Sequence, residues 1–203
     1  MVRVVPFKNE KNMTNKKAKI SEHFVALRGR AYKTDTSNLQ EIKILNVKDI
    51  NTNFVDIAQC ESQNIDTNLD ENLFLQKGDV VIPCRGNGTI KVGIITSINE
   101  PCVPSQNVIL IRETTADVSS EYLKIFFESP TGKELLTKLQ GGGAIKLISH
   151  KDLLQLEIPI PDKDTQTFIV KEFNKGKSEY EQKINQAVTT WENIQSSLYA
   201  KFN

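Results

Sequence analysis

The segment from Leu110 to Phe173, LIRETTADVSSEYLKIFFESPTGKELLTKLQGGGAIKLISHKDLLQLEIPIPDKDTQTFIVKEF, changes its hydrophobic period several times. It starts on an apolar strand-like run, continues as two helical pieces around Ser129-Pro130, and reaches three glycines at 141–143. A β-like run with two prolines follows, and then an uninterrupted helical pattern begins. This order predicts an α+β fold, in which a β-rich domain with small helices precedes a long C-terminal coiled-coil helix.

The two helical pieces lie on either side of Pro130, which cannot continue a helix without a bend. Ser119 or Ser120 is positioned to cap the first piece, and the three glycines end the second. The apolar positions that predict the two pieces are Leu123, Ile125, Phe126 and Phe127 before the proline, and Leu135, Leu136 and Leu139 after it.

The part of the chain before this segment alternates in the manner of strands with short connections. We expect residues 1–18 to be a flexible basic N-terminus, residues 19–161 to form one domain, and residues 162–203 to form the long helix. The predicted strands cover 42–50, 53–61, 80–84, 92–96 and 107–112.

The C-terminal helix carries apolar side chains at alternating spacings of three and four residues, the pattern of a coiled-coil seam. About 40 residues of helix span roughly 60 Å. Such a helix needs a partner, and we expect dimerisation through it; the alternative is that it folds back onto its own domain. The predicted dimerisation residues are Tyr180, Ile184, Ala187, Trp191, Ile194 and Leu198.

The charges are nearly balanced overall, at a formal net charge of +1, but they are unevenly distributed. Residues 1–48 hold eleven Lys and Arg against four Asp and Glu, whereas residues 49–123 hold four against eleven. One end of the chain can therefore face an anion.

Targeting and metal signals are missing from the sequence. No apolar run reaches the roughly 18 residues of a membrane span, and the N-terminus lacks the apolar region of a signal peptide. Three cysteines without CxxC spacing and only two histidines predict neither a disulfide framework nor a zinc site. These features favour a cytoplasmic protein that makes no contact with a membrane.

The order of the motifs QKGDVVIPCRG, PSQNVILIR, SSEYLKIFFESPTGKELL, a Gly-rich loop and L-x-I-P-I-P-x-x-x-x-Q-x-x-I resembles one target-recognition domain and one conserved helix of a type I restriction-modification specificity subunit. The resemblance covers about residues 19–203. Members of that family usually carry two such domains and two helices, whereas this chain carries one of each. The resemblance therefore implies a half-length form that dimerises with a second copy or with a different specificity chain.

The resemblance also implies a function. The chain would be a non-catalytic specificity subunit that reads one half of a bipartite double-stranded DNA target and docks methyltransferase (modification) subunits. Through them it would join a motor-nuclease (restriction) subunit. No cofactor is expected in this chain, and S-adenosylmethionine and ATP would belong to the partner subunits.

Three basic or glycine-containing loops, RGRAYK, CRGNGTIK and QGGGAIK, are the candidate DNA contacts, because guanidinium groups bind phosphates and guanine edges and glycines allow close approach to a groove. In this interpretation the three glycines let a loop enter the groove. The alternative is that the loops are ordinary solvated turns. The candidate DNA-binding residues are Arg28, Arg30, Tyr32, Lys33, Arg85, Asn87, Thr89, Lys91, Gln106, Gln140, Gly142 and Lys146.

The segment IPIP reads as an edge strand or strap, because Pro159 and Pro161 deny a sheet two backbone donors. Asp162 is a plausible N-cap for the long helix. Gln166, on its first turns, either anchors the junction through its amide or is an ordinary surface glutamine.

Two other classes of function remain as alternatives. Asp35, Glu41 and Lys43 match the D-x(n)-E-x-K pattern of metal-dependent nucleases, although its spacing is permissive. GNGTIKVG is not followed by the Lys-Ser or Lys-Thr of a phosphate-binding loop. The second alternative is a coiled-coil protein-interaction module that assembles partners without binding DNA.

Overall fold

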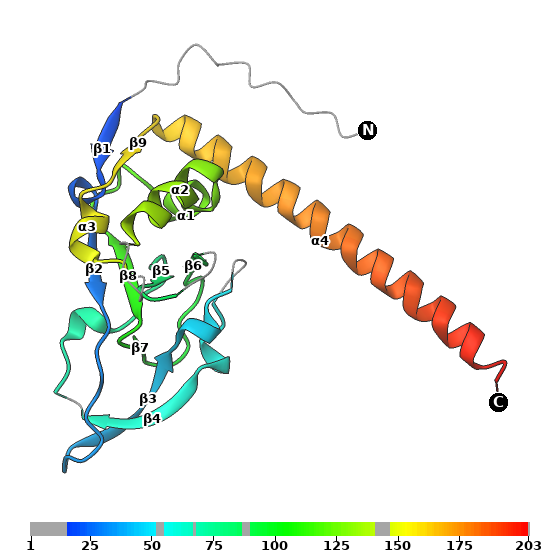
Figure 1. Ribbon diagram of the computed structural model, residues 1–203, viewed down its shortest axis with the longest axis horizontal. Helices are drawn as coiled ribbons and strands as arrows, with labels where there is room; N and C mark the ends of the chain where they lie inside the picture. The colour runs from blue at the N-terminus through cyan, green and yellow to red at the C-terminus, as the bar shows by residue number, and fades with distance from the viewer. Residues whose placement is uncertain (1–15, 52–54, 67, 87–89, 141–146, 203) are drawn as a thin grey trace. The chain divides into compact units, whose positions relative to one another are not determined.

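The computed structural model of the chain describes residues 16–51, 55–66, 68–86, 90–140 and 147–202. Contacts divide the chain into two compact units, Met1–Gln166 and Thr167–Asn203. The first unit contains the strands and short helices, and the second is formed by the greater part of the long helix α4 (Lys163–Tyr199) (Figure 1).

The first unit is built on a four-stranded sheet with the order β2-β8-β5-β6, in which all neighbours are antiparallel. Its strands are β2 (Phe24–Arg28), β8 (Val108–Glu113), β5 (Val80–Pro83) and β6 (Gly93–Ile94). β5 is buried at every position and β8 at its first four, which accounts for their nearly continuous apolar sequences.

A second sheet has the order β4-β3-β7, with β3 antiparallel to β4 and parallel to β7. Its strands are β3 (Leu39–Leu45), β4 (Glu61–Asp66) and β7 (Cys102–Pro104). A cluster of buried apolar side chains, with Leu45 and Cys102 from this sheet and Val81 and Leu110 from the larger one, joins the two sheets. Burial of this cluster holds them as one body.

The helices α1 (Ser120–Glu128) and α2 (Pro130–Leu139) confirm the predicted pair broken at Pro130. The Ser119 hydroxyl accepts from the Tyr122 amide and caps α1, and the Ser129 hydroxyl caps α2 in the same way. Leu123 and Phe127 are fully buried, and α1 packs against β5 and β6. A third helix, α3 (His150–Leu154), lies against β2.

The chain segment before the long helix pairs with the N-terminal segment. β9 (Glu157–Pro159) and β1 (Lys17–Lys19) form a two-stranded antiparallel sheet, and they lie side by side in Figure 1. Of the segment IPIP, predicted as an edge strand or a strap, Ile158 and Pro159 lie in a strand, while Ile160 and Pro161 follow it. Lys17 and Ala18 lie in a strand rather than in a tail. The carboxylate of Asp162 then accepts from the Thr165 amide at 2.8 Å and caps α4.

Two predicted strands have the wrong bounds. The predicted strand over 42–50 ends at Leu45, because a short 3-10 helix, η3 (Val47–Asp49), follows it. The predicted strand over 53–61 is wrong in its described part, where Val55 and Ile57 bury into the core from a loop and from the 3-10 helix η4 (Ile57–Gln59). The observed strand β4 begins only at Glu61. Its sequence is polar because it is mostly exposed, and its backbone pairing with β3 makes it a strand.

Candidate functional site

The strand directions bring the predicted loops to one edge of the four-stranded sheet. β2 ends at this edge with Arg28, β8 begins here with Val108, and β5 ends here with Pro83. β6 is antiparallel to β5, so the residues that precede it, such as Lys91, lie at the same edge. We call the described loop residues that meet here (28–33, 84–86, 90–91, 104–107, 140 and 147–148) the loop edge.

Hydrogen bonds link all four of these loops to one another. The Arg28 Nε donates to the carbonyl of Gln106 at 2.8 Å, and the Cys84 amide donates to the carbonyl of Asn107 at 2.8 Å. The Ile148 amide donates to the Cys84 carbonyl at 2.8 Å. The loop edge is therefore a connected surface rather than a set of independent turns.

The remaining loop contacts place two further predicted residues. Gln140 Nε2 donates to the Gly86 carbonyl at 3.4 Å, and Arg85 pairs with Leu147 in an isolated β-bridge. Both bring the segment after α2 against the loop between β5 and β6. Arg85 itself is exposed, so its guanidinium is accessible to a partner from solution.

A small cavity of about 270 Å³ lies between the loop after β2 and the loop after β4. Arg30 stands over the ring of Tyr32, with its guanidinium carbon 6.0 Å from the ring centroid, and donates to the Asn68 carbonyl at 3.4 Å. Tyr32 donates to the Pro104 carbonyl at 2.7 Å, and its burial raises the pKa of its hydroxyl to about 12. Lys33 and Asp66 also line the cavity.

The side chains of the loop edge suit a ligand that carries both phosphates and hydrogen-bonding base edges. Cationic side chains come from three chain segments: Arg28, Arg30 and Lys33 from the first, Arg85 from the second, and Lys91 just before β6. Arginine forks bind phosphates and guanine edges, and lysines bind phosphates as point charges. Gln106, exposed between them, offers an amide donor and acceptor.

The structure thus brings together eight of the predicted residues: Arg28, Arg30, Tyr32, Lys33, Arg85, Lys91, Gln106 and Gln140. The other four, Asn87, Thr89, Gly142 and Lys146, lie outside the described residues, together with the three glycines at 141–143.

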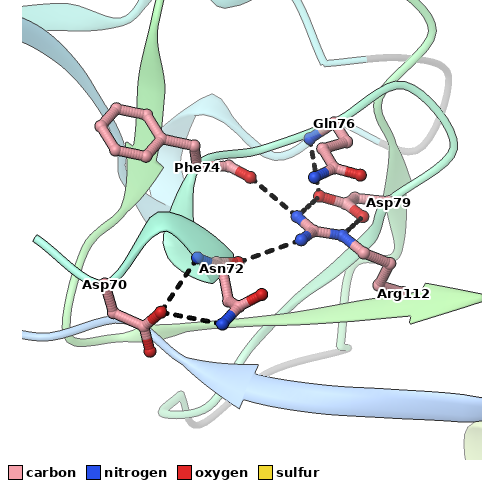
Figure 2. Close-up of polar contacts among 6 residues, drawn as sticks. All are labelled: Asp70, Asn72, Phe74, Gln76, Asp79 and Arg112. Atoms are coloured by element: carbon pink, nitrogen blue, oxygen red, sulfur yellow. Dashed lines mark hydrogen bonds and ion pairs between the residues drawn. The ribbon is translucent and has the colours of Figure 1, made fainter.

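An ion pair that was not predicted from the sequence fixes the segment before β5. Arg112, on β8, donates to both oxygens of the buried Asp79 carboxylate at 2.8 and 2.7 Å, and also to the carbonyls of Asn72 and Phe74 (Figure 2). The backbone of Gln76 donates to the same carboxylate. A signal was present in the sequence, because an arginine inside an otherwise apolar strand needs a buried partner.

The sequence left two roles open for Gln166, an anchor of the junction or a surface residue. Its side chain is buried. Its Oε1 accepts from the Ser119 amide at 3.0 Å, while its Nε2 donates to the carbonyls of Asp117 and Pro161 at 2.8 and 2.9 Å. The first turn of α4 is thereby tied to the segment that precedes α1. The anchoring alternative is the one that the contacts support, and the surface alternative is wrong.

The lysine of the nuclease-like pattern is held by the backbone of the fold. Lys43 donates through its amine to the carbonyls of Ala58 and Cys60 at 3.2 and 3.0 Å, so its charge is engaged in the fold. Across the described ranges, three or more His, Cys, Asp or Glu side chains nowhere gather as metal ligands would.

Two further properties bear on the environment of the protein. Cys60, Cys84 and Cys102 are buried free thiols. Among the helices that the structure describes, none combines the length and apolar character that a membrane span requires.

The apolar positions of α4 are exposed in the second unit. Tyr180, Trp191 and Leu198 are 65%, 57% and 49% exposed, and Ile184 and Ile194 are 46% exposed each. Ala187 is also exposed. These six residues, which we call the seam, lie at the spacing of a coiled coil on a helix of 37 residues.

Comparison with known proteins matches this arrangement to one family. The model of the type I restriction modification DNA specificity domain matches residues 12–190. No curated protein matches the sequence.

Solved structures share the fold at low sequence identity. A chain of a type I R-M system, studied for complex assembly and conformational transition, superposes with a TM-score of 0.58 at 15% identity over 81% of this chain and 38% of its own. The type I S subunit from M. genitalium gives 0.57 at 15% identity, with 87% and 42% covered. The HsdS subunit from Thermoanaerobacter tengcongensis gives 0.53 at 15% identity, with 81% and 37% covered.

The chain therefore spans about two fifths of the length of these solved chains. Because the family model covers most of the chain, including the loop edge and most of α4, the chain belongs to the family of type I restriction modification DNA specificity domains.

Proposed function

We propose that this chain is a sequence-reading subunit of a type I restriction-modification system, which recognises one half of a bipartite double-stranded DNA target. The single observation that carries the proposal is the loop edge, where cations from three segments meet beside an exposed glutamine. Membership of the DNA specificity family supports the same reading.

The chain's own part in the reaction is to bind and orient DNA. Lysine and arginine side chains of the loop edge neutralise phosphates and fix the register, and arginine and amide side chains read base edges in the major groove. Methyl transfer and cleavage belong to methyltransferase and motor-nuclease subunits, which bind S-adenosylmethionine and ATP. This chain is then non-catalytic and works in the compartment that holds the DNA, the cytoplasm.

Pairing through the seam brings in a second recognition domain, which binds the second half of the target. Its exposed apolar residues support pairing with a helix of the same kind, and a second copy is the partner that we propose. Two copies related by a twofold axis read the same half-site in inverted orientation. The target is then a palindrome of two short blocks separated by an unread spacer.

Salt-dependent DNA binding tests the proposal. The full chain is titrated onto a fluorescent duplex, and the logarithm of the association constant is followed between about 50 and 200 mM salt. We expect affinity to fall steeply, with the slope becoming shallower by about one unit in Lys33→Ala. Lys77→Ala is the matched control, because Lys77 is an exposed lysine in the turn before β5, at the opposite edge of the sheet.

The alternative of an assembly module without DNA predicts a different outcome. In that case the chain shows no salt-dependent affinity for duplex DNA, and Lys33→Ala and Lys77→Ala behave alike. Either result contradicts the proposal.

A further inference from the structure

Gln106 stands at the tip of a tight turn on the loop edge. The Val108 amide donates to the Ser105 carbonyl at 2.9 Å, which makes Gln106 and Asn107 the central residues of the turn. The Gln106 side chain is exposed, whereas its carbonyl is held from inside by the Arg28 Nε and by the Cys84 thiol at 3.5 Å. The amide is therefore presented to solvent from a fixed backbone.

Arg28 is fixed beside it. Since the Nε of Arg28 is engaged at 2.8 Å by the Gln106 carbonyl, the plane of the guanidinium is set by a backbone atom of the neighbouring loop. A guanidinium anchored in this way keeps its two terminal NH2 groups as a donor fork. Arg28 is also the last residue of β2, so its backbone belongs to the sheet.

The close approach of the two segments depends on Gly29. Its amide donates to the Val108 carbonyl at 3.0 Å, and a Cβ at this position would lie 2.1 and 2.2 Å from the carbonyl oxygens of Pro104 and Ser105. The two residues that flank Gln106 each carry a buried oxygen, Ser105 Oγ and Asn107 Oδ1, without a hydrogen-bond partner among the described residues. The position of the turn is thus fixed by its close contact with Gly29.

The two lysines of the loop edge are held differently. Lys33 and Lys91 are exposed lysines, whose flexible stems carry a point charge without preferred direction. Base recognition needs a directed pattern of donors and acceptors, while phosphate binding needs only charge within reach. Pre-organised side chains on rigid elements are the ones that can supply such direction.

We propose that Arg28 and Gln106 form the base-reading pair of this chain, with Arg28 contacting a guanine and Gln106 an adenine of neighbouring base pairs in the major groove, and with Lys33 and Lys91 contacting phosphates. The inference rests on the proposed function and adds the division of labour within the site. It also implies that the half-site contains a guanine next to an adenine, on the same strand or across the step.

The experiment is a selection of binding sites from a random duplex library by the full chain and its variants. Arg28→Lys keeps the positive charge but removes the fork, and Gln106→Ala removes the amide but keeps the carbonyl that anchors Arg28. Lys33→Ala removes a proposed phosphate contact. Gln76→Ala is the matched control, because Gln76 is an exposed glutamine in the segment before β5, at the other edge of the sheet.

We expect the wild-type chain and Gln76→Ala to enrich the same motif. Arg28→Lys should lose the preference for guanine at one position, and Gln106→Ala the preference for adenine at the neighbouring position. Each should lower affinity for the wild-type motif by about 5- to 150-fold with less effect on unrelated duplexes. Lys33→Ala should keep the full motif and weaken all duplexes alike.

Three outcomes overturn the inference. If Arg28→Lys and Gln106→Ala, checked as folded by circular dichroism, enrich the unchanged motif, base reading lies elsewhere while the proposed function stands. If Lys33→Ala alters the motif, the division of labour is wrong. If the wild-type chain enriches no motif at all, the proposed function fails and the inference fails with it. Should Arg28→Lys not fold, Gln106→Ala decides alone, because it leaves every backbone contact of the turn in place.

Discussion

Replacing Gln166 by alanine removes three hydrogen bonds at once, from a side chain that is only 4% exposed. A hydrogen bond contributes about 1 kcal/mol net, and each buried group left without a partner costs about 1–3 kcal/mol. Water can reach some of the three backbone groups after the change, so the lower part of the range applies. We expect Gln166→Ala to lower the free energy of unfolding of the first unit by about 2–4 kcal/mol.

The assay is urea unfolding followed by far-ultraviolet circular dichroism at one fixed protein concentration, since dimerisation would otherwise shift the midpoint. Gln182→Ala is the control, because Gln182 is an exposed glutamine on the same helix, and its replacement should change stability by less than about 0.5 kcal/mol. Hydrogen exchange of the Ser119 amide gives a local readout, because this amide donates to the Gln166 side chain.

A more informative variant is Gln166→Glu, which keeps the acceptor for Ser119 but sets a carboxylate oxygen against the carbonyls of Asp117 and Pro161. We expect it to destabilise the first unit at neutral pH at least as much as alanine does. If Gln166→Ala and Gln182→Ala unfold at the same urea concentration, and the Ser119 amide exchanges at the wild-type rate, the reasoning about this junction is refuted.

Three other variants test separate parts of the structure. Arg112→Ala leaves the buried Asp79 carboxylate without its cationic partner. It should lower the free energy of unfolding by about 3–5 kcal/mol, measured by the same urea titration. Gly29→Ala places a methyl group against backbone carbonyls of the neighbouring turn, so it should destabilise the first unit by about 1–3 kcal/mol and weaken DNA binding in the titration onto the fluorescent duplex. The double change Trp191→Glu and Leu198→Glu places charges in the seam and should convert the proposed dimer to a monomer in sedimentation.

Each of these has a result that would contradict it. Wild-type stability of Arg112→Ala would show that the ion pair adds nothing to the fold. Unchanged stability and DNA affinity of Gly29→Ala would show that the loop edge tolerates a shift of its segments. An unchanged mass in sedimentation would show that α4 does not pair through the seam.

Elements with a strong local signal were predictable from the sequence. The break between α1 and α2 follows from Pro130, and the start of α4 follows from the capping carboxylate of Asp162. The buried strands β5 and β8 follow from short apolar runs between turns. In each case the residues that decide the structure are neighbours in the chain.

Elements that depend on distant partners were not predictable. β4 is polar, and it is a strand because β3 pairs with it. β1 is a strand because it pairs with β9, which lies about 140 residues away in the sequence. The predicted strand over 53–61 failed because the alternating Val55 and Ile57 reflect packing into the core from irregular backbone.

The candidate site was predictable in its composition but not in its organisation. Arginines, lysines and glycines in loops were visible in the sequence, whereas their meeting at one edge follows from the order β2-β8-β5-β6 and its antiparallel directions. The anchoring of Arg28 on the Gln106 carbonyl joins residues 78 positions apart. No local pattern encodes such a contact.

The most direct test of the central claim, that the loop edge holds DNA, is photo-crosslinking from single positions. A photoreactive benzophenone amino acid replaces Gln106 on the loop edge or, as the matched control, Gln76 at the opposite edge, and the full chain is irradiated with a labelled duplex. We predict a covalent protein–DNA adduct from position 106, competed away by unlabelled duplex, and none from position 76. An adduct from position 76 alone, or equal adducts from both positions, would contradict the account.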